Sequence, residues 1–368
     1  MKLTIAREAW LSALQMAYGA VDRKQAVPIL GNLLIEATPG KVAVWGTDLE
    51  IEVSATASAD VQVEGKTTIP ARKLWEIWRS LPPGSVAEIS AAGGRATIRS
   101  GPTRFSLTTL EPEGFPLTQG FEALVTVTLP ATELKTLLER VHFAMAQQDV
   151  RYYLNGLLLE VGEGRLRAVG ADGHRLALCD AKLVGNQGEI LQAIVPRKAV
   201  GEVMRLGYGE AQEATLEIGA QALRVTTGDL RLVARLIEGR FPEYQRVIPD
   251  PEVWDKHVLV EREELRQALS RAAILANERY RSVRLSVTSG RLGIQSENAE
   301  HEQVEEDLEV DYEGPPIVIG FNVGYLIDAV SAIPGERVRL CLNDDNSSCL
   351  LLAETETACR YVVMPMRL

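Results

Sequence analysis

The sequence predicts an α+β fold of three tandem domains, and two regularities carry this prediction. A short apolar strand followed at once by an amphipathic helix recurs six times in the 368 residues, at intervals of 59 to 66 residues. Three strand-like runs then follow each helix, so each unit is predicted to be β-α-β-β-β. Paired units would give two helices and eight mostly antiparallel strands per domain, with the helices covering one face of the sheets.

The starts of the repeated helices have similar residues from copy to copy. The strands that precede them end at Ile5, Ile69, Leu129, Val195, Val260 and Ile319. Pro70, Pro130 and Pro196 lie at or near helix starts, where a missing N–H costs nothing and the fixed φ of proline suits a helix. In residues 131–141, apolar residues at i, i+3, i+4 and i+7 form one stripe. We therefore expect six amphipathic helices.

The strand-like runs and the turns between them set the domain boundaries. The runs of the first two units are Asn32–Ala37, Lys41–Gly46, Ile51–Thr56, Val86–Ala91, Arg95–Arg99 and Arg104–Leu110. Gly40, Gly164 and Gly290 mark turns in equivalent places of alternate units. Segments rich in Pro, Gly or charge near residues 115–122 and 247–256 read as linkers. We expect domains at residues 1–120, 121–247 and 248–368.

The composition excludes several classes of protein. With 46% hydrophobic and 24% charged residues, the chain is neither disordered nor fibrous, and its mean hydropathy of -0.01 does not fit a membrane protein. Arg7 and Glu8 occupy the place where a secretory signal needs its apolar core, so we expect a cytoplasmic protein. The four cysteines lack CxxC and metal-ligand spacings, so we expect reduced, partly buried thiols. No metal site and no cofactor are predicted.

The net charge of -11 is unevenly divided along the chain. The six predicted helices together carry +3, which leaves -14 for the rest, and Arg23 and Lys24 follow the first helix. If the helices shared one surface, it would be neutral to basic and suited to a polyanion held through its phosphates, without base readout. The alternative is that Lys and Arg merely solvate exposed helix faces.

Eight segments spread over the whole chain carry a family resemblance. They are PILGNLLIEA (28–37), GTDLEIEV (46–53), IPARKLWEI (69–77), QQDVRYYLNG (147–156), ADGHRLALC (171–179), FPEYQRVIP (241–249), FNVGYLID (321–328) and YVVMPMRL (361–368). With them the chain resembles the bacterial β sliding clamps, the processivity factors of DNA polymerase III. The resemblance implies a head-to-tail homodimer of three clamp domains per protomer, closed as a ring with helices lining the hole and sheets outside.

The resemblance also implies a function without catalysis. Such a ring encircles duplex DNA, slides without sequence specificity, and tethers the replicative polymerase through a hydrophobic cleft. Further implied partners are the clamp loader and other polymerases and repair proteins that carry clamp-binding peptides; no membrane is involved. The DNA contacts it implies or makes plausible are Lys24, Arg72, Gln148, Tyr152, Tyr153, Arg197, Lys198 and Arg205. Lys24 stands where relatives have arginine, and Tyr152 with Tyr153 could instead be a strand-edge pair packed on a sheet.

The peptide cleft is implied by the same resemblance. Its residues would be Leu154, Gly173, His174, Arg175, Leu176, Pro242, Arg246, Val247, Tyr280, Asn322, Tyr325, Ser348, Val362, Val363, Met364, Pro365, Met366 and Arg367. Thioether side chains suit a pocket that accepts many related peptides. Ala171 stands where relatives often have Thr, and Tyr280 where they may have Phe, which could shift the peptide preference.

A subunit contact is implied between the first and third domains. Alone, the acidic run Glu297–Glu313 reads as a solvated edge or loop. In the resemblance it faces basic residues of a neighbouring first domain, and edge strands of two chains pair. The interface residues would be Lys73, Arg104, Phe105, Leu107, Ile274, Leu275, Glu300, Glu302 and Glu305.

Two other functions remain open from the residues. Asp172 and His174 could act as an acid–base pair in a hydrolase or transferase, or the chain could be a protein-binding scaffold that never touches DNA. Against the enzyme, there are only four histidines and no Gly-rich phosphate loop before a helix. A six-fold repeat also suits a ring around a rod better than a single active site.

Overall fold

The computed structural model describes residues 1–22, 27–118, 120–184, 188–206, 212–248, 254–356 and 358–367. The chain forms two compact units, which are described separately: unit 1 is Met1–Lys135 with Lys198–Leu236, and unit 2 is Thr136–Arg197 with Ile237–Leu368. Within the described ranges, no helix has the length and apolar character needed to cross a membrane.

The predicted α+β repeat is confirmed. Within the described residues the α-helices are α1 (Arg7–Ala20), α2 (Ala71–Ser80), α3 (Ala131–Glu139), α4 (Arg197–Arg205), α5 (Arg262–Ala272) and α6 (Val323–Ala332). Each helix follows one strand and precedes three, so the chain runs through six β-α-β-β-β units in order. One additional short strand, β5 (Asp60–Val63), was not predicted.

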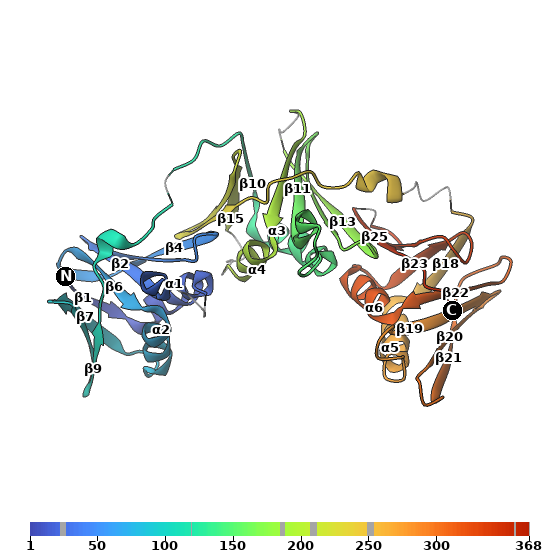
Figure 1. Cartoon of the computed structure of the whole chain (residues 1–368), viewed down its shortest axis with the longest axis horizontal. Helices are drawn as coiled ribbons and strands as arrows, with labels where there is room; N and C mark the ends of the chain where they lie inside the picture. The colour runs from blue at the N-terminus through green and yellow to red at the C-terminus, as the bar shows by residue number, and fades with distance from the viewer. Residues whose placement is uncertain are drawn as a thin grey trace. The chain divides into compact units, whose positions relative to one another are not determined.

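Unit 1 contains two antiparallel sheets (Figure 1). The first has the order β5, β1 (Lys2–Ala6), β7 (Val86–Ala92), β8 (Arg95–Ser100) and β9 (Thr103–Thr108). The second has the order β10 (Val125–Pro130), β15 (Glu213–Ile218), β16 (Ala222–Thr227), β17 (Leu230–Arg235), β4 (Ile51–Ser58), β3 (Lys41–Thr47), β2 (Asn32–Thr38) and β6 (Gly65–Pro70). Helices α1 and α2 lie side by side, and Trp10 meets Trp78 edge-on at 4.9 Å between ring centroids.

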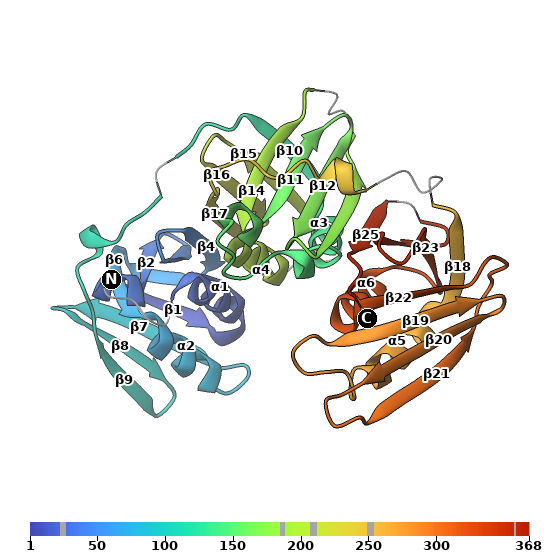
Figure 2. The same ribbon diagram turned by 45° about the vertical axis from the view of Figure 1, so that its right-hand side comes forward.

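Unit 2 also contains two antiparallel sheets (Figure 2). The larger has the order β14 (Leu191–Pro196), β11 (Gly156–Gly162), β12 (Arg165–Ala171), β13 (Arg175–Lys182), β25 (Cys359–Val363), β24 (Cys349–Ala353), β23 (Arg337–Leu342) and β18 (Lys256–Glu261). The smaller has the order β21 (Gln303–Glu309), β20 (Arg291–Glu297), β19 (Ser282–Thr288) and β22 (Ile317–Asn322). Helices α5 and α6 pack together.

The pairing of strands between repeats is regular. The leading strand of each repeat pairs with the first strand after the helix of its companion repeat, as β1 does with β7 and β6 with β2. The last strands of repeats pair three repeats apart, β4 with β17 and β13 with β25. The last strands of the second and fifth repeats, β9 and β21, each end a sheet.

The glycine turns are confirmed where the sequence placed them. Gly40, Gly164 and Gly290 have φ of 79°, 73° and 73°, in the left-handed region that glycine adopts without a steric penalty.

The expectation of four reduced cysteines is wrong for two of them. Cys179 of β13 lies directly opposite Cys359 of β25, and the two form a disulfide across 180 residues of sequence. Their proximity depends on the register of two distant strands, which no local spacing reveals. Cys341 and Cys349 are free and buried, as expected, and burial raises the pKa of the Cys341 thiol to about 11.

Candidate functional site

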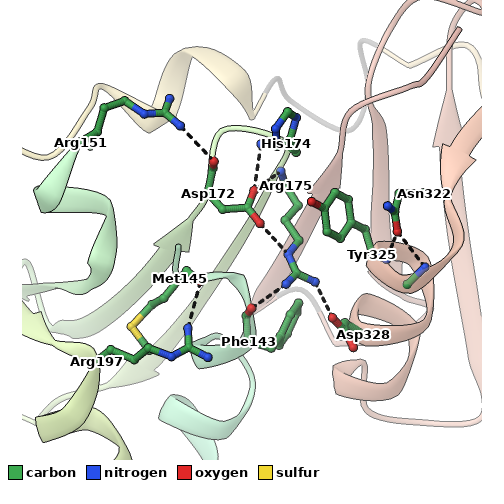
Figure 3. A network of polar contacts seen from close by, with 11 residues as sticks. Phe143, Met145, Arg151, Asp172, His174, Arg175, Arg197, Asn322, Tyr325 and Asp328 are labelled. Atoms are coloured by element: carbon green, nitrogen blue, oxygen red, sulfur yellow. Dashed lines mark hydrogen bonds and ion pairs between the residues drawn. The ribbon is translucent and has the colours of Figure 1, made fainter. Parts of the chain in front are cut away.

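Asp172 builds the turn that links β12 to β13 in unit 2. Its Oδ1 accepts hydrogen bonds from the backbone N–H groups of His174 and Arg175, at 2.9 and 3.0 Å (Figure 3). Gly173, between them, has a φ of 90°, which suits glycine. The Asp172 carboxylate is thus occupied by the backbone of its own turn.

Arg175 joins this turn to helix α6. It donates to Asp172 Oδ2 at 3.0 Å, to the Phe143 carbonyl at 2.8 Å and to Asp328 Oδ2 at 2.5 Å (Figure 3). The guanidinium also lies over the rings of Tyr325 and Phe143, at 4.5 and 5.3 Å from their centroids. With only 13% of its side chain exposed, Arg175 braces the Asp172 turn against α6, a role that the sequence did not predict.

Arg151 holds the same turn from the other side. Its Nη2 donates to the Asp172 carbonyl at 3.2 Å and to Asp149 Oδ2 at 2.8 Å. The hydrogen bonds from Arg151 lower the pKa of the Asp149 carboxyl to about 2. Arg151, Phe143 and Asp328 were not predicted as site residues; the signal for Arg151 and Asp328 was their place inside the segments QQDVRYYLNG and FNVGYLID.

The apolar residues assigned to the cleft separate into a floor and a rim. Leu154, Leu176 and Val362 are buried in one hydrophobic cluster. Val247 and Met364 are exposed, as rim residues that could meet a partner. Of the other apolar or aromatic assignments, Val363 is buried and Pro242 and Tyr280 are exposed, whereas Tyr325, Pro365 and Met366 are half-buried.

The end of the chain is fastened across both sheets of unit 2. The Met364 N–H donates to the His174 carbonyl at 2.9 Å, and the Met366 N–H donates to the Gly320 carbonyl at 2.8 Å. Pro365, Met366 and Arg367 line a depression of about 600 Å³. The terminal residues therefore lie beside the Asp172 turn and also beside β22.

The other assigned cleft residues have identifiable contacts. Asn322 Oδ1 caps α6 by accepting from Gly324 and Tyr325 N–H at 2.9 and 3.3 Å, and the Tyr325 ring stacks on His174 at 6.3 Å (Figure 3). Arg246 is exposed and pairs with Glu243, and Ser348 is half-buried just before β24.

In unit 1, each cation assigned to DNA that falls in the described ranges has a carboxylate partner. Arg72 Nε donates to Glu76 Oε1 at 2.8 Å on the exposed face of α2. Lys198 pairs with Asp48 and also donates to the Ala20 carbonyl at 2.9 Å. Arg205 pairs with Glu202, whose pKa is raised by burial. Lys24 lies outside the described residues.

A depression of about 490 Å³ beside Arg72 includes residues that the sequence analysis did not assign. Tyr18 and Trp75 stack at 6.4 Å between ring centroids, and Arg79 also lines the depression. Basic residues around a stacked aromatic pair on two neighbouring helices are the signal that a search by helix face could have found.

In unit 2, the residues assigned to DNA precede β11 or begin α4. Gln148 is exposed with a φ of 55°, and Tyr152 and Tyr153 meet edge-on at 5.7 Å. Tyr152 is exposed and Tyr153 half-buried. Arg197 donates to the Met145 carbonyl at 3.0 Å, and burial together with nearby Arg175 lowers its pKa.

The residues assigned to a subunit contact lie on or beside the edge strands. In unit 1, Arg104, Phe105 and Leu107 are on β9, and Lys73 is exposed on α2. In unit 2, Glu305 is on β21, Glu300 and Glu302 precede that strand, and Ile274 and Leu275 follow α5. Ile274 is 77% exposed, which is unusual for a large aliphatic side chain without a partner.

Comparison with known proteins covers the whole chain. Residues 1–119, 128–243 and 245–367 match the N-terminal, central and C-terminal domains of the DNA polymerase III beta subunit. The beta sliding clamp of Pseudomonas putida is 44% identical and that of Escherichia coli K12 is 43% identical, each over 369 residues and 100% of both chains.

Solved structures agree with the sequence relatives. A DnaN sliding clamp from Pseudomonas aeruginosa matches with a TM-score of 0.96 at 42% identity, and Caulobacter crescentus pol III beta matches with 0.92 at 36%, each over 100% of both chains. The family consists of non-catalytic processivity clamps whose partners are DNA and the polymerase, so the enzyme and the DNA-independent scaffold are both wrong. The chain belongs to the bacterial β sliding clamps, the β subunits of DNA polymerase III.

Proposed function

We propose that two copies of this chain close head to tail into a ring that encircles duplex DNA in the cytoplasm. Each protomer contributes three clamp domains with boundaries near residues 120 and 247. The ring is held on DNA by its topology, so its phosphate contacts can be weak enough to allow sliding. Contacts to base edges, which would hold the ring at one particular DNA sequence, are not needed.

The strand-pairing rule is the observation that carries this proposal. Within one chain, the last strands of repeats one and four pair, and so do those of repeats three and six. Repeats two and five are left with the edge strands β9 and β21. A second chain offers the missing partners, since β9 of each protomer can pair with β21 of the other. Two such contacts use every last strand and leave a closed assembly.

The charges of the two edge strands favour their pairing. β9 carries Arg104, whereas β21 has the sequence QVEEDLE and carries four carboxylates. Arg271 of α5 already neutralises Glu306 and Arg291 pairs with Asp307, which leaves Glu305 and Glu309 without an ion pair in the described part of the chain. Exposed Ile274 and the apolar residues of β9 supply apolar surface that this contact removes from water, which favours association.

Sedimentation of the purified chain tests this assembly. At micromolar concentration we expect a dimer, and Leu107→Glu combined with Ile274→Glu should give a monomer. Leu124→Glu changes a leucine of unit 1 that is 61% exposed and lies on neither edge strand, and it should leave the dimer intact. A monomeric wild type, or a double variant that stays dimeric, would contradict the ring.

We further propose that the floor and rim around the Asp172 turn take short peptides from the polymerase, the clamp loader and repair proteins. The buried floor, the exposed rim residues and the fastened chain end support this assignment. Deleting residues 364–368 should abolish binding of such peptides and leave the dimer unchanged. Retained affinity would refute the cleft, and loss of the dimer would show that the deletion acts on assembly instead.

The proposed DNA contacts are Arg72, Gln148, Tyr152, Tyr153, Arg197, Lys198 and Arg205, with Lys24 carried over from the family alone. The carboxylate partners of Arg72, Lys198 and Arg205 support contacts that are individually weak, because each phosphate must compete with an existing ion pair.

A further inference from the structure

Unit 1 contains a depression of about 370 Å³ that lies outside the sites described above. Its lining includes Leu49, Glu50, Pro116, Ala222, Val233 and Arg235. These residues come from the turn before β4, the segment after β9, and the strands β16 and β17. The internal repeat allows each of them to be compared with a residue of unit 2.

The turn before β4 repeats the Asp172 turn. Asp48 Oδ1 accepts from the backbone N–H groups of Glu50 and Ile51 at 2.9 and 2.8 Å, as Asp172 Oδ1 does from those of His174 and Arg175. Leu49 has a φ of 79°, close to the 90° of Gly173. Leu49 and Glu50 therefore occupy the places of Gly173 and His174.

The neighbouring strand has the same register in both units. Arg235 N–H donates to the Glu50 carbonyl at 2.9 Å, and Met364 N–H donates to the His174 carbonyl at 2.9 Å. Arg235 therefore takes the place of Met364. Two residues earlier, Val233 lies opposite Glu52 just as Val362 lies opposite Leu176.

The third wall corresponds as well. Ala222 lies opposite Arg235, and the equivalent position beside Met364 is that of Ser348, since Cys349 lies opposite Val363. Pro116 follows a buried phenylalanine, as Pro242 does.

Both Phe-Pro segments are fastened by a buried carboxylate. Thr118 N–H donates to Glu52 Oε2 at 2.6 Å in unit 1, and the Tyr244 hydroxyl donates to Glu160 Oε2 at 2.5 Å in unit 2. The two carboxylates come from different strands, Glu52 from β4 and Glu160 from β11, but the turn, the neighbouring strand and the Phe-Pro segment around the depression correspond to those around the cleft proposed in unit 2.

We propose that this depression is a second peptide site, which takes a short segment with one bulky apolar side chain beside one carboxylate. The proposal rests on the proposed function, because the comparison uses the cleft of unit 2 as a peptide site. It differs from that cleft in the chemistry of the peptide it selects.

The apolar part of this preference comes from two exposed leucines. Leu49 is 52% exposed and Leu117, which also lines the depression, is 45% exposed. Leu49 is also held in the left-handed region, where a branched side chain is strained. An apolar side chain placed between them would remove both from water.

The acidic part comes from Arg235. Its side chain is exposed and forms no ion pair with any residue that the structure describes, and it replaces the neutral thioether of Met364. A carboxylate beside the apolar anchor would pair with this guanidinium. Glu50, at the opposite rim, disfavours a second acidic residue there.

Photo-cross-linking on the full-length chain separates the two sites in one experiment. The probe is the peptide Gly-Ser-benzoylphenylalanine-Asp-Gly, and its matched control has Lys in place of Asp. Adducts are mapped by mass spectrometry to residues 48–51, 115–118 and 230–236 for the new site, and to 172–176 and 359–367 for the cleft.

We expect adducts of the Asp peptide at the new site. Arg235→Glu should lower them about fivefold and Leu117→Ser about tenfold, and neither should change adducts at the cleft. Met364→Ser should lower only the cleft adducts. Adducts confined to the new site would support this inference and contradict the cleft. The absence of adducts at the new site would overturn the proposal. It would also be overturned if the yield of adducts there were unchanged by Arg235→Glu and equal for the Asp and Lys peptides.

Discussion

The turns at Asp48 and Asp172 have the same backbone, but their side chains make very different contacts. In unit 2 the residue after the turn is Arg175, which is tied to Asp172, Phe143 and Asp328. Its counterpart in unit 1 is Ile51, which is simply buried. Repeated backbone geometry thus sets where a surface lies, and the substituted side chains decide what that surface can bind.

The strand pairs beside these turns differ in the same way. The Cys179–Cys359 disulfide of unit 2 occupies the place where unit 1 has Ala55 opposite Leu230. Unit 2 is therefore braced twice near the proposed cleft, by a covalent bond and by Arg175. Unit 1 has neither brace, which makes its strands β4 and β17 an internal reference for β13 and β25.

Replacing the disulfide by its counterpart pair should have the largest effect. Cys179→Ala with Cys359→Leu is expected to lower the free energy of unfolding of unit 2 by about 2 to 5 kcal/mol, because the cross-link restricts the unfolded chain. Amide hydrogen exchange of β13 and β25 measures this under non-reducing conditions, with β4 and β17 as the reference. Equal exchange in variant and wild type, or four alkylatable thiols in the unfolded wild type without reductant, would contradict the disulfide.

Removing the arginine brace should have the next largest effect. Arg175→Ala leaves Asp328 and the Phe143 carbonyl without a donor and is expected to destabilise unit 2 by about 3 kcal/mol. Arg235→Ala is the matched control, since that exposed arginine should change stability by less than about 0.5 kcal/mol. Urea unfolding followed by hydrogen exchange distinguishes them, and similar losses for both variants would show that Arg175 is no brace.

Changing the left-handed residue of each turn should change stability slightly and in opposite directions. Gly173→Ala puts a Cβ at a φ of 90° and within 2.8 Å of Arg151 Nη2, so we expect a loss of about 1 kcal/mol. Leu49→Gly relieves left-handed strain and should stabilise unit 1 by less than about 1 kcal/mol. Thermal unfolding checks both signs, and a destabilising Leu49→Gly would mean that Leu49 packs better than its exposure indicates.

The repeat could be predicted from the sequence, whereas the disulfide and the Arg175 contacts that brace unit 2 could not. Helices and strands follow from local periodicity, so runs such as Lys41–Gly46 and Val86–Ala91 were found within two residues of their observed ends. The short β5, with the sequence DVQV, alternates polar and apolar residues over only four positions, which is too short a run to distinguish it from a loop. The disulfide joins residues 180 positions apart, which the register of β13 and β25 brings together, and the Arg175–Asp328 ion pair joins β13 to helix α6 across 153 positions.

The distribution of charge along the sequence likewise could not reveal which ion pairs form. It left Lys198 as a plausible residue of a neutral-to-basic helix surface, whereas the structure pairs Lys198 with Asp48, a residue 150 positions earlier. The cleft residues came from the family resemblance, and the structure groups Leu154, Leu176 and Val362 in one cluster. Composition and spacing do not reveal which side chains of different repeats are in contact.

Retention on DNA tests the central claim most directly. The chain is loaded onto nicked circular DNA with a clamp loader, separated from free protein, and the DNA is then linearised. A ring held by topology should stay on the circle and leave the linear molecule by sliding off its ends. Equal retention on the circle and on the linear DNA would contradict encirclement and would mean that the chain binds DNA by direct contact.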